Sequence, residues 1–91
     1  MAQIIKTNNG FQIIKMPVQE AIAVLDCFGE CNLCGEPIPD GYYIPVINQW
    51  YCETCYNAWV SSAIRYRSDI GVERKRFNEI CDRLRGLGVL E

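Results

Sequence analysis

Histidine is missing from this 91-residue chain, and its absence narrows the chemistry that the chain can perform. Without an imidazole there is no common general base, no Cys–His nucleophile pair and no mixed histidine–cysteine zinc site. The sequence also lacks the glycine-rich loops that cradle phosphates, whether Gly-x-x-x-x-Gly-Lys or Gly-x-Gly-x-x-Gly. We therefore expect no enzymatic activity, no nucleotide binding and no small-molecule substrate.

Long hydrophobic runs are absent as well. Charged side chains such as Lys6, Lys15, Asp26 and Arg65 interrupt the apolar stretches, so none reaches the roughly 20 residues that span a bilayer. The segment Met1–Met16 has no basic start followed by an unbroken apolar core, so it does not match a secretory signal. We expect a cytoplasmic protein, without a membrane helix, whose cysteines stay reduced.

Charge is unevenly distributed, although the formal net charge is only −2. Residues 1–64 hold two bases against six acids, whereas residues 65–91 hold seven bases against five acids. Such a basic tail can attract a polyanion or an acidic protein face. The simpler interpretation is a solvated helix face on which bases alternate with acids. The candidate contact residues in this tail are Arg65, Tyr66, Arg67, Arg74, Lys75 and Arg76.

Turn residues divide the chain into short elements of one domain, residues 1–91. Isoleucine-rich runs flank Asn9-Gly10, whose tolerance of positive φ suits a tight turn, so residues 1–16 are predicted to form a β-hairpin. Pro17 suits the first turn of a helix. We therefore predict a helix over residues 17–29 that ends at Gly29. Its apolar stripe is Val18, Ala21, Ile22, Leu25 and Phe28.

Beyond residue 30 the pattern predicts a second hairpin and two more helices. The hairpin is formed by two short extended runs, Tyr42–Ile47 and Gln49–Cys52. Helical spacing from Tyr56 to Arg67 predicts a helix that begins within the second cysteine pair and is broken at Ser68-Asp69. The last helix falls within residues 70–86, roughly Val72–Arg85. Its apolar stripe is Phe77, Ile80, Cys81 and Leu84.

Four of the six cysteines form two closely spaced pairs, Cys31-x-x-Cys34 and Cys52-x-x-Cys55, separated by seventeen residues. Both sulfurs of a Cys-x-x-Cys turn point to the same side, and backbone amides and the N-terminus of a helix favour the thiolate. Two such pairs can close a tetrahedron around one structural zinc ion. The alternatives are an iron–sulfur cluster, two unrelated buried pairs, or a redox dithiol.

A zinc ion held by four thiolates is structural, because no coordination position remains for water.

Cys27 lies four residues before Cys31, so it is either a spare ligand near the metal or a structural residue of the preceding helix. Cys81 lies on the apolar stripe of the last helix, and we interpret it as a small buried apolar residue.

The cysteine region resembles a known zinc module. The stretch Phe28–Pro39, with Pro45 ahead of Cys52-x-x-Cys55-Tyr56, is similar to the zinc finger of the DksA/TraR family of bacterial transcription regulators, including the seventeen-residue interval. It resembles more loosely one zinc module of a LIM domain. The resemblance covers residues 28–56. It implies a treble-clef finger over residues 31–67, made of a zinc knuckle, a β-hairpin and a helix, and a bacterial or phage setting.

The matched region leaves out the part through which that family acts. DksA/TraR proteins insert a long helical hairpin with acidic residues at its tip into the secondary channel of RNA polymerase. Here a β-hairpin occupies about half of the residues before the finger, so we expect no comparable coiled coil. The expected fold is a small α+β zinc-binding domain with a treble-clef finger between an N-terminal hairpin and helix and a C-terminal helical pair.

An inert metal site together with ten aromatic residues predicts a protein-interaction module or regulator, in a form encoded by a phage or mobile element. Most of the aromatic residues are expected to pack around the finger, and Tyr66, between Arg65 and Arg67, is the best candidate for an exposed contact. The alternative is a transcription-related zinc finger that binds nucleic acid through its basic C-terminal helices, with Tyr66 stacked on a base. Homo-oligomerisation is a further option.

Overall fold

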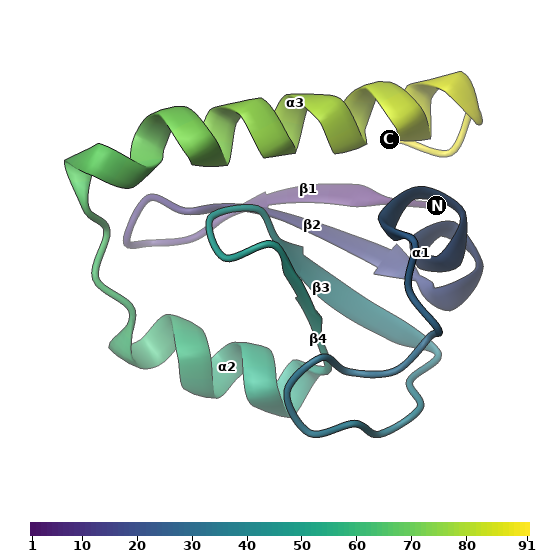
Figure 1. Cartoon of the computed structure of the whole chain (residues 1–91), viewed down its shortest axis with the longest axis horizontal. Helices are drawn as coiled ribbons and strands as arrows, with labels where there is room; N and C mark the ends of the chain where they lie inside the picture. The colour runs from purple at the N-terminus through teal and green to yellow at the C-terminus, as the bar shows by residue number, and fades with distance from the viewer.

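A four-stranded antiparallel sheet with the strand order β1-β2-β3-β4 forms the centre of the molecule (Figure 1). The computed structural model describes the whole chain, residues 1–91. The predicted α+β class is confirmed, with three α-helices around the sheet. The strands are β1 (Gln3–Lys6), β2 (Gln12–Pro17), β3 (Asp40–Ile44) and β4 (Gln49–Tyr51). The helices are α1 (Val18–Leu25), α2 (Glu53–Ser62), the single 3-10 turn η1 (Arg67–Asp69) and α3 (Ile70–Gly86).

The two predicted hairpins join into one sheet through β2 and β3. In this pairing Ile14 lies opposite Tyr43 and Met16 lies opposite Gly41. Gly41 allows the Trp50 side chain of β4 to lie against the backbone, because a Cβ at this position would stand 2.5 Å from the indole. The sequence patterns predicted each hairpin from its own turn but contained no signal for the register between them.

Both faces of the sheet are covered, which follows from the alternation of side chains along each strand. On β2, Ile13 points to one core and Ile14 to the other, and on β4 Trp50 and Tyr51 divide in the same way. Helices α1 and α3 cover the first face, and α2 covers the second (Figure 1). The first core consists of Ala2, Ile14, Met16, Ala21, Val24, Tyr43, Trp50, Ile80, Cys81 and Leu84. The second consists of Phe11, Ile13, Cys31, Ile44, Tyr51 and Tyr56.

Helix α1 is shorter than predicted. It ends at Leu25 because Asp26 adopts the left-handed conformation, with φ 55° and ψ 46°, and turns the chain out of the helix. The predicted end at Gly29 and the inclusion of Phe28 in the apolar stripe are therefore wrong. The buried residues of α1 are Ala21 and Val24, whereas Phe28 lies beyond the helix and is 93% exposed.

Helix α2 also ends earlier than predicted. The prediction continued the helix to Arg67, but α2 ends at Ser62 and Ala63 is extended, with ψ 138°. The Asn9 side chain donates to the carbonyl oxygens of Val60 and Ala63, at 3.2 and 3.4 Å. A turn residue 54 positions away therefore satisfies the last carbonyls of α2.

Helix α3 agrees with the sequence pattern. Ile80, Cys81 and Leu84 are buried against the sheet, and Phe77 is half-buried at the edge of the same core. The chain ends beside its start, since the Ala2 N–H donates to the Val89 carbonyl oxygen at 2.7 Å. None of the three helices combines the length and the apolar character needed to cross a bilayer.

Candidate metal centre

The structure brings the two cysteine pairs together in one cluster. The Sγ atoms of Cys31, Cys34, Cys52 and Cys55 all lie within 4.8 Å of one another. The Sγ atoms of Cys34 and Cys52, one from each pair, are 3.9 Å apart. No pair is joined as a disulfide, and all six cysteines are free. The predicted set of four cysteines is therefore assembled in space as well as in sequence.

The first pair lies in a tight turn that we call the knuckle, residues 30–37, closed by the pairing of Glu30 with Pro37. Within it the Gly35 N–H donates to the Cys31 carbonyl oxygen at 2.9 Å, and the Cys31 N–H donates to the Glu36 carbonyl oxygen at 2.9 Å. Gly35 has φ 79°, which glycine adopts at little cost. These contacts hold the Cys31 and Cys34 side chains on the same side of the turn.

The second pair is placed by the start of α2. Cys52 is the N-cap of this helix, and its Sγ accepts a hydrogen bond from the Cys55 N–H at 3.5 Å. The Tyr56 N–H donates to the Cys52 carbonyl oxygen at 2.8 Å. Free N–H groups and the positive end of the helix dipole favour thiolate at this position. The predicted location of the second pair at a helix N-terminus is confirmed.

Asn32 joins the knuckle to the edge of the sheet. Its N–H donates to the Trp50 carbonyl oxygen at 2.9 Å, and its Oδ1 accepts from the Trp50 N–H at 2.7 Å. These bonds satisfy groups on β4 that would otherwise be unpaired at the sheet edge. Sequence reasoning missed this role. A short polar residue directly after the first cysteine of the pair was its only signal.

The thiols of the cluster differ strongly in acidity. Burial of Cys31 opposes ionisation, but backbone hydrogen bonds, chiefly from Cys34 and Cys52, outweigh it and lower the pKa of Cys31 to about 6. At Cys55 the hydrogen bond with the Cys52 side chain, together with burial, raises the pKa to about 12. The surroundings of Cys31 therefore stabilise one thiolate, but four thiolates this close together would repel one another. A cation in their midst would remove that conflict.

This donor set fits a metal ion that prefers sulfur. Zinc–sulfur bonds are about 2.3 Å long, so the corners of a tetrahedral site are about 3.8 Å apart. The 3.9 Å separation of Cys34 and Cys52 matches that spacing. The cluster could thus hold one metal ion, and four soft thiolates make zinc a plausible occupant.

The two remaining cysteines lie elsewhere. Cys27 is not part of the sulfur cluster; it lies in the loop after α1 and packs against the first core. Its predicted place on the preceding helix is wrong, because that helix ends at Leu25. Cys81 is buried against the sheet, as predicted, and burial raises its pKa.

The candidate contact residues of the basic tail fall into two groups. Arg65 and Arg76 make internal contacts: Arg65 Nη2 lies 2.7 Å from the buried carboxylate of Glu73, and Arg76 Nη1 donates to the Pro45 carbonyl oxygen at 3.2 Å. The other candidates are exposed and take part in none of the ion pairs of the structure. They are Tyr66, Arg67, Arg74 and Lys75.

The acids of the basic tail were expected on a solvated helix face, and for Glu73 this is wrong, because it is the one buried charged residue. One carboxylate oxygen pairs with Arg65, and the other accepts from the Gln12 N–H at 3.2 Å. This network ties α3 to both the N-terminal hairpin and the connection after α2. A glutamate in the first turn of a helix usually faces solvent, so the position of Glu73 in the sequence did not indicate that it is buried.

The aromatic residues divide into buried and exposed groups. Tyr43 and Trp50 are buried in the first core and Tyr51 and Tyr56 in the second, whereas Tyr66, as predicted, is exposed at 57%. No family model, curated protein or solved structure matches this chain. The resemblance to the DksA/TraR and LIM zinc modules therefore stays a prediction that rests on the cysteine motif.

Proposed function

We propose that Cys31, Cys34, Cys52 and Cys55 hold one structural zinc ion, and that the chain is a non-catalytic protein-interaction module. The observation that carries the metal assignment is the meeting of four sulfurs from two distant segments. The knuckle, the β3–β4 hairpin and the N-terminus of α2 follow one another as in a treble-clef finger. We include that fold type in the proposal.

The donor set supports a structural role for the metal. Four thiolates complete a tetrahedron and leave no place for a water or a substrate. No histidine is available as a base near the site, because the chain contains none. The metal would instead fix the knuckle against α2 and so make a rigid platform.

The surface that supports an interaction role is the connection between α2 and α3. We call residues 63–67 the contact segment. Ile64 is 67% exposed and Tyr66 is 57% exposed, and the exposed base Arg67 comes directly after Tyr66. Aromatic residues and arginine supply much of the binding energy at protein interfaces. Two large apolar side chains beside a free cation fit a partner surface that is apolar and acidic.

Capture of partners from a bacterial lysate tests this function with three baits. Wild-type protein and Leu87→Ser, which changes an exposed apolar residue directly after α3, should retain the same partner. Tyr66→Ser should lose it while still binding one zinc ion, as measured by native mass spectrometry. Equal capture by Tyr66→Ser and wild type would exclude the contact segment, and a purified chain without metal would exclude the zinc assignment.

Nucleic-acid binding is the second candidate. The specific observation in its favour is that Arg67, Arg74 and Lys75 are exposed and form no ion pairs. Phosphate contacts of this kind weaken steeply as salt rises. A gel shift at low salt with DNA and RNA separates the two candidates. Retardation that is lost in Arg74→Glu would favour nucleic-acid binding. No retardation at micromolar protein would exclude nucleic-acid binding.

A further inference from the structure

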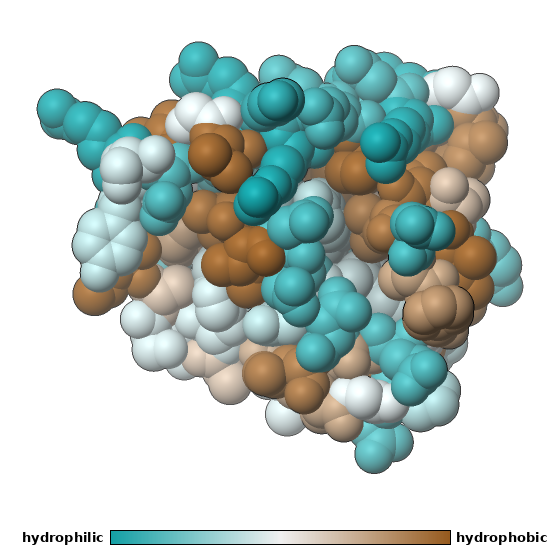
Figure 2. All heavy atoms as spheres, viewed as in Figure 1, coloured by the Kyte–Doolittle hydropathy of each residue, from teal (hydrophilic) through white to brown (hydrophobic).

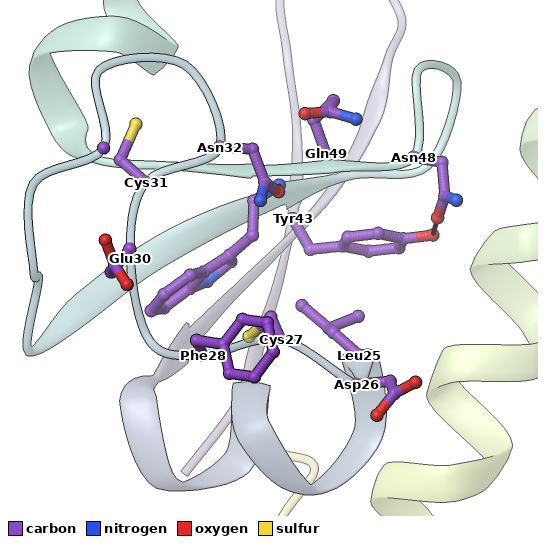
Figure 3. Close-up of a pocket in the computed structure, with 12 residues that line it drawn as sticks. Leu25, Asp26, Cys27, Phe28, Glu30, Cys31, Asn32, Tyr43, Asn48 and Gln49 are labelled. Carbon is purple, nitrogen blue, oxygen red and sulfur yellow. Dashed lines mark hydrogen bonds between the residues drawn. The ribbon is translucent and has the colours of Figure 1, made fainter.

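A pocket opens between the loop after α1, the knuckle and the β3–β4 hairpin, with a volume of about 460 Å³. Figure 3 shows Asp26 and Phe28 on the side of α1, Glu30 on the side of the knuckle and Tyr43 reaching in from β3. Figure 2 shows the same face hollowed near its centre, with hydrophobic atoms gathered on the α1 side. The pocket is within the size range of ligand sites and can admit an aromatic side chain.

The pocket is acidic and partly apolar. Its lining includes two carboxylates, Asp26 and Glu30, and no lysine or arginine. Neither carboxylate takes part in an ion pair of the structure. Phe28 stands at its rim with 93% of its surface exposed. A fully exposed phenylalanine beside unpaired acids fits an occupant that brings both an apolar group and a cation.

The arginines of α3 beside this pocket form no ion pair with these acids. Arg76 and Arg83 lie on α3 beside a neighbouring pocket. Arg76 donates to the carbonyl oxygens of the β3–β4 turn, and Arg83 Nη1 donates to the Val24 carbonyl oxygen at 2.9 Å. Both guanidinium groups are therefore already engaged with backbone oxygens on the α3 side.

The contact segment of the same sequence has the complementary character. Its backbone is extended at Ala63 and Tyr66, so alternate side chains point to opposite sides. Arg65 points inward to Glu73, whereas Ile64 and Tyr66 are exposed. Arg67 follows directly as an exposed cation. The segment thus presents two apolar side chains and one positive charge away from the body of the molecule.

We infer that the pocket of one copy of this chain receives the contact segment of a second copy, with Tyr66 against Phe28 and Arg67 beside Glu30. The inference rests on the proposed function and names the partner. The contact segment lies on the opposite side of the molecule from α1 (Figure 1), so a chain does not fill its own pocket. Because the two surfaces differ, the contact is head-to-tail and allows further copies to add.

Two double variants test this assembly, each disabling one surface. The pocket variant is Phe28→Ser with Glu30→Lys, and the segment variant is Tyr66→Ser with Arg67→Glu. Analytical ultracentrifugation of zinc-loaded wild type should show a mean mass that rises with protein concentration and falls with added salt. Each variant alone should be monomeric at the same concentrations. A 1:1 mixture should form dimers only, because each variant retains one working surface.

A matched control reverses charges away from both surfaces. Arg85→Glu and Glu91→Lys alter exposed residues and should self-associate like wild type. Zinc content and circular dichroism report whether the double variants fold. If either does not, the single changes Glu30→Lys and Arg67→Glu replace them, with an expected loss of about tenfold in association constant. A monomeric wild type, or variants that assemble as well as wild type, would overturn the inference.

Failure here and failure of the proposed function give different results. A monomeric wild type that still captures another protein through Tyr66 would remove self-assembly and leave the interaction module in place. A chain that assembles head-to-tail but captures nothing else would identify the second copy as its partner.

Discussion

The two faces of the sheet are held by different means. The first face is covered by α1 and α3 over a continuous apolar core, in which Ile80, Cys81 and Leu84 of a long helix meet β2. The second face has a smaller core under the short helix α2, and one of its members is Cys31, a cluster residue. The comparison teaches that hydrophobic packing suffices where a long helix lies on the sheet. Where a short helix and the knuckle cover it, the apolar core is smaller and includes a residue of the sulfur cluster, at which we propose that a metal ion adds stability.

The largest effect is expected from breaking the sulfur cluster. Cys52→Ser removes a proposed ligand, and we expect loss of stoichiometric zinc and of cooperative unfolding. Structural zinc contributes about 10–16 kcal/mol in finger peptides, as much as the whole stability of a small domain, about 5–15 kcal/mol. Because β2 and β3 carry side chains to both cores, the first face should lose order as well. Elemental analysis and thermal melting measure both quantities.

Cys27→Ser is the matched control for that prediction. It removes a thiol only four residues from Cys31 but outside the sulfur cluster. We expect one zinc ion per chain and a melting temperature close to that of wild type. A Cys52→Ser variant that behaves like this control would show that the second face stands without metal.

A cavity in the first core should have the next largest effect. Leu84 is fully buried between α3 and the sheet, so Leu84→Ala should lower the free energy of unfolding by about 2–5 kcal/mol. Zinc stoichiometry should not change, because the cluster lies on the other face. Chemical denaturation measures the loss. Leu87→Ala, at an exposed position on the same end of the chain, should change stability by less than about 0.5 kcal/mol.

The elements that sequence predicted best depend on local signals. The spacing of Ile80, Cys81 and Leu84 is a helical period, and the cysteine pairs have metal-site spacing, so α3 and the cluster were both predictable. Each of these signals consists of residues that lie close together in the sequence, and the cysteine motif occurs twice. The N-terminal hairpin was predictable in the same way, although its loop spans residues 7–11 and only Gly10, not Asn9, adopts positive φ.

Two of the features that sequence missed depend on distant partners, and a third depends on one local turn. Helix α2 ends where Asn9 reaches its last carbonyls, and the burial of Glu73 depends on Arg65 and on a backbone amide of β2. The exposure of Phe28 follows from the left-handed turn at Asp26, which aspartate adopts only in some contexts. A periodic pattern continued across that turn and predicted a stripe that the backbone does not form.

The buried ion pair links the connection after α2 to the first face, and its loss should have a moderate effect. Glu73→Gln keeps the shape of the side chain but removes the charge opposite Arg65. We expect a loss of about 1–3 kcal/mol in the free energy of unfolding, because Arg65 and the Gln12 N–H lose a charged acceptor. Chemical denaturation measures it. Glu79→Gln, on the exposed side of α3, should be neutral, and an equal loss there would point to helix charge rather than the buried pair.

The smallest effect is expected where the knuckle meets β4. Asn32→Ala removes the acceptor of the Trp50 N–H, and we expect a loss of about 1 kcal/mol because Asn32 is exposed and water can take the place of its side chain. Hydrogen exchange of the Trp50 amide should become faster while zinc stays bound. Asn57→Ala, at an exposed position on α2, should leave that amide unchanged. An unchanged Trp50 amide in Asn32→Ala would mean that metal alone holds the knuckle to the sheet, which would make the difference between the two faces sharper still.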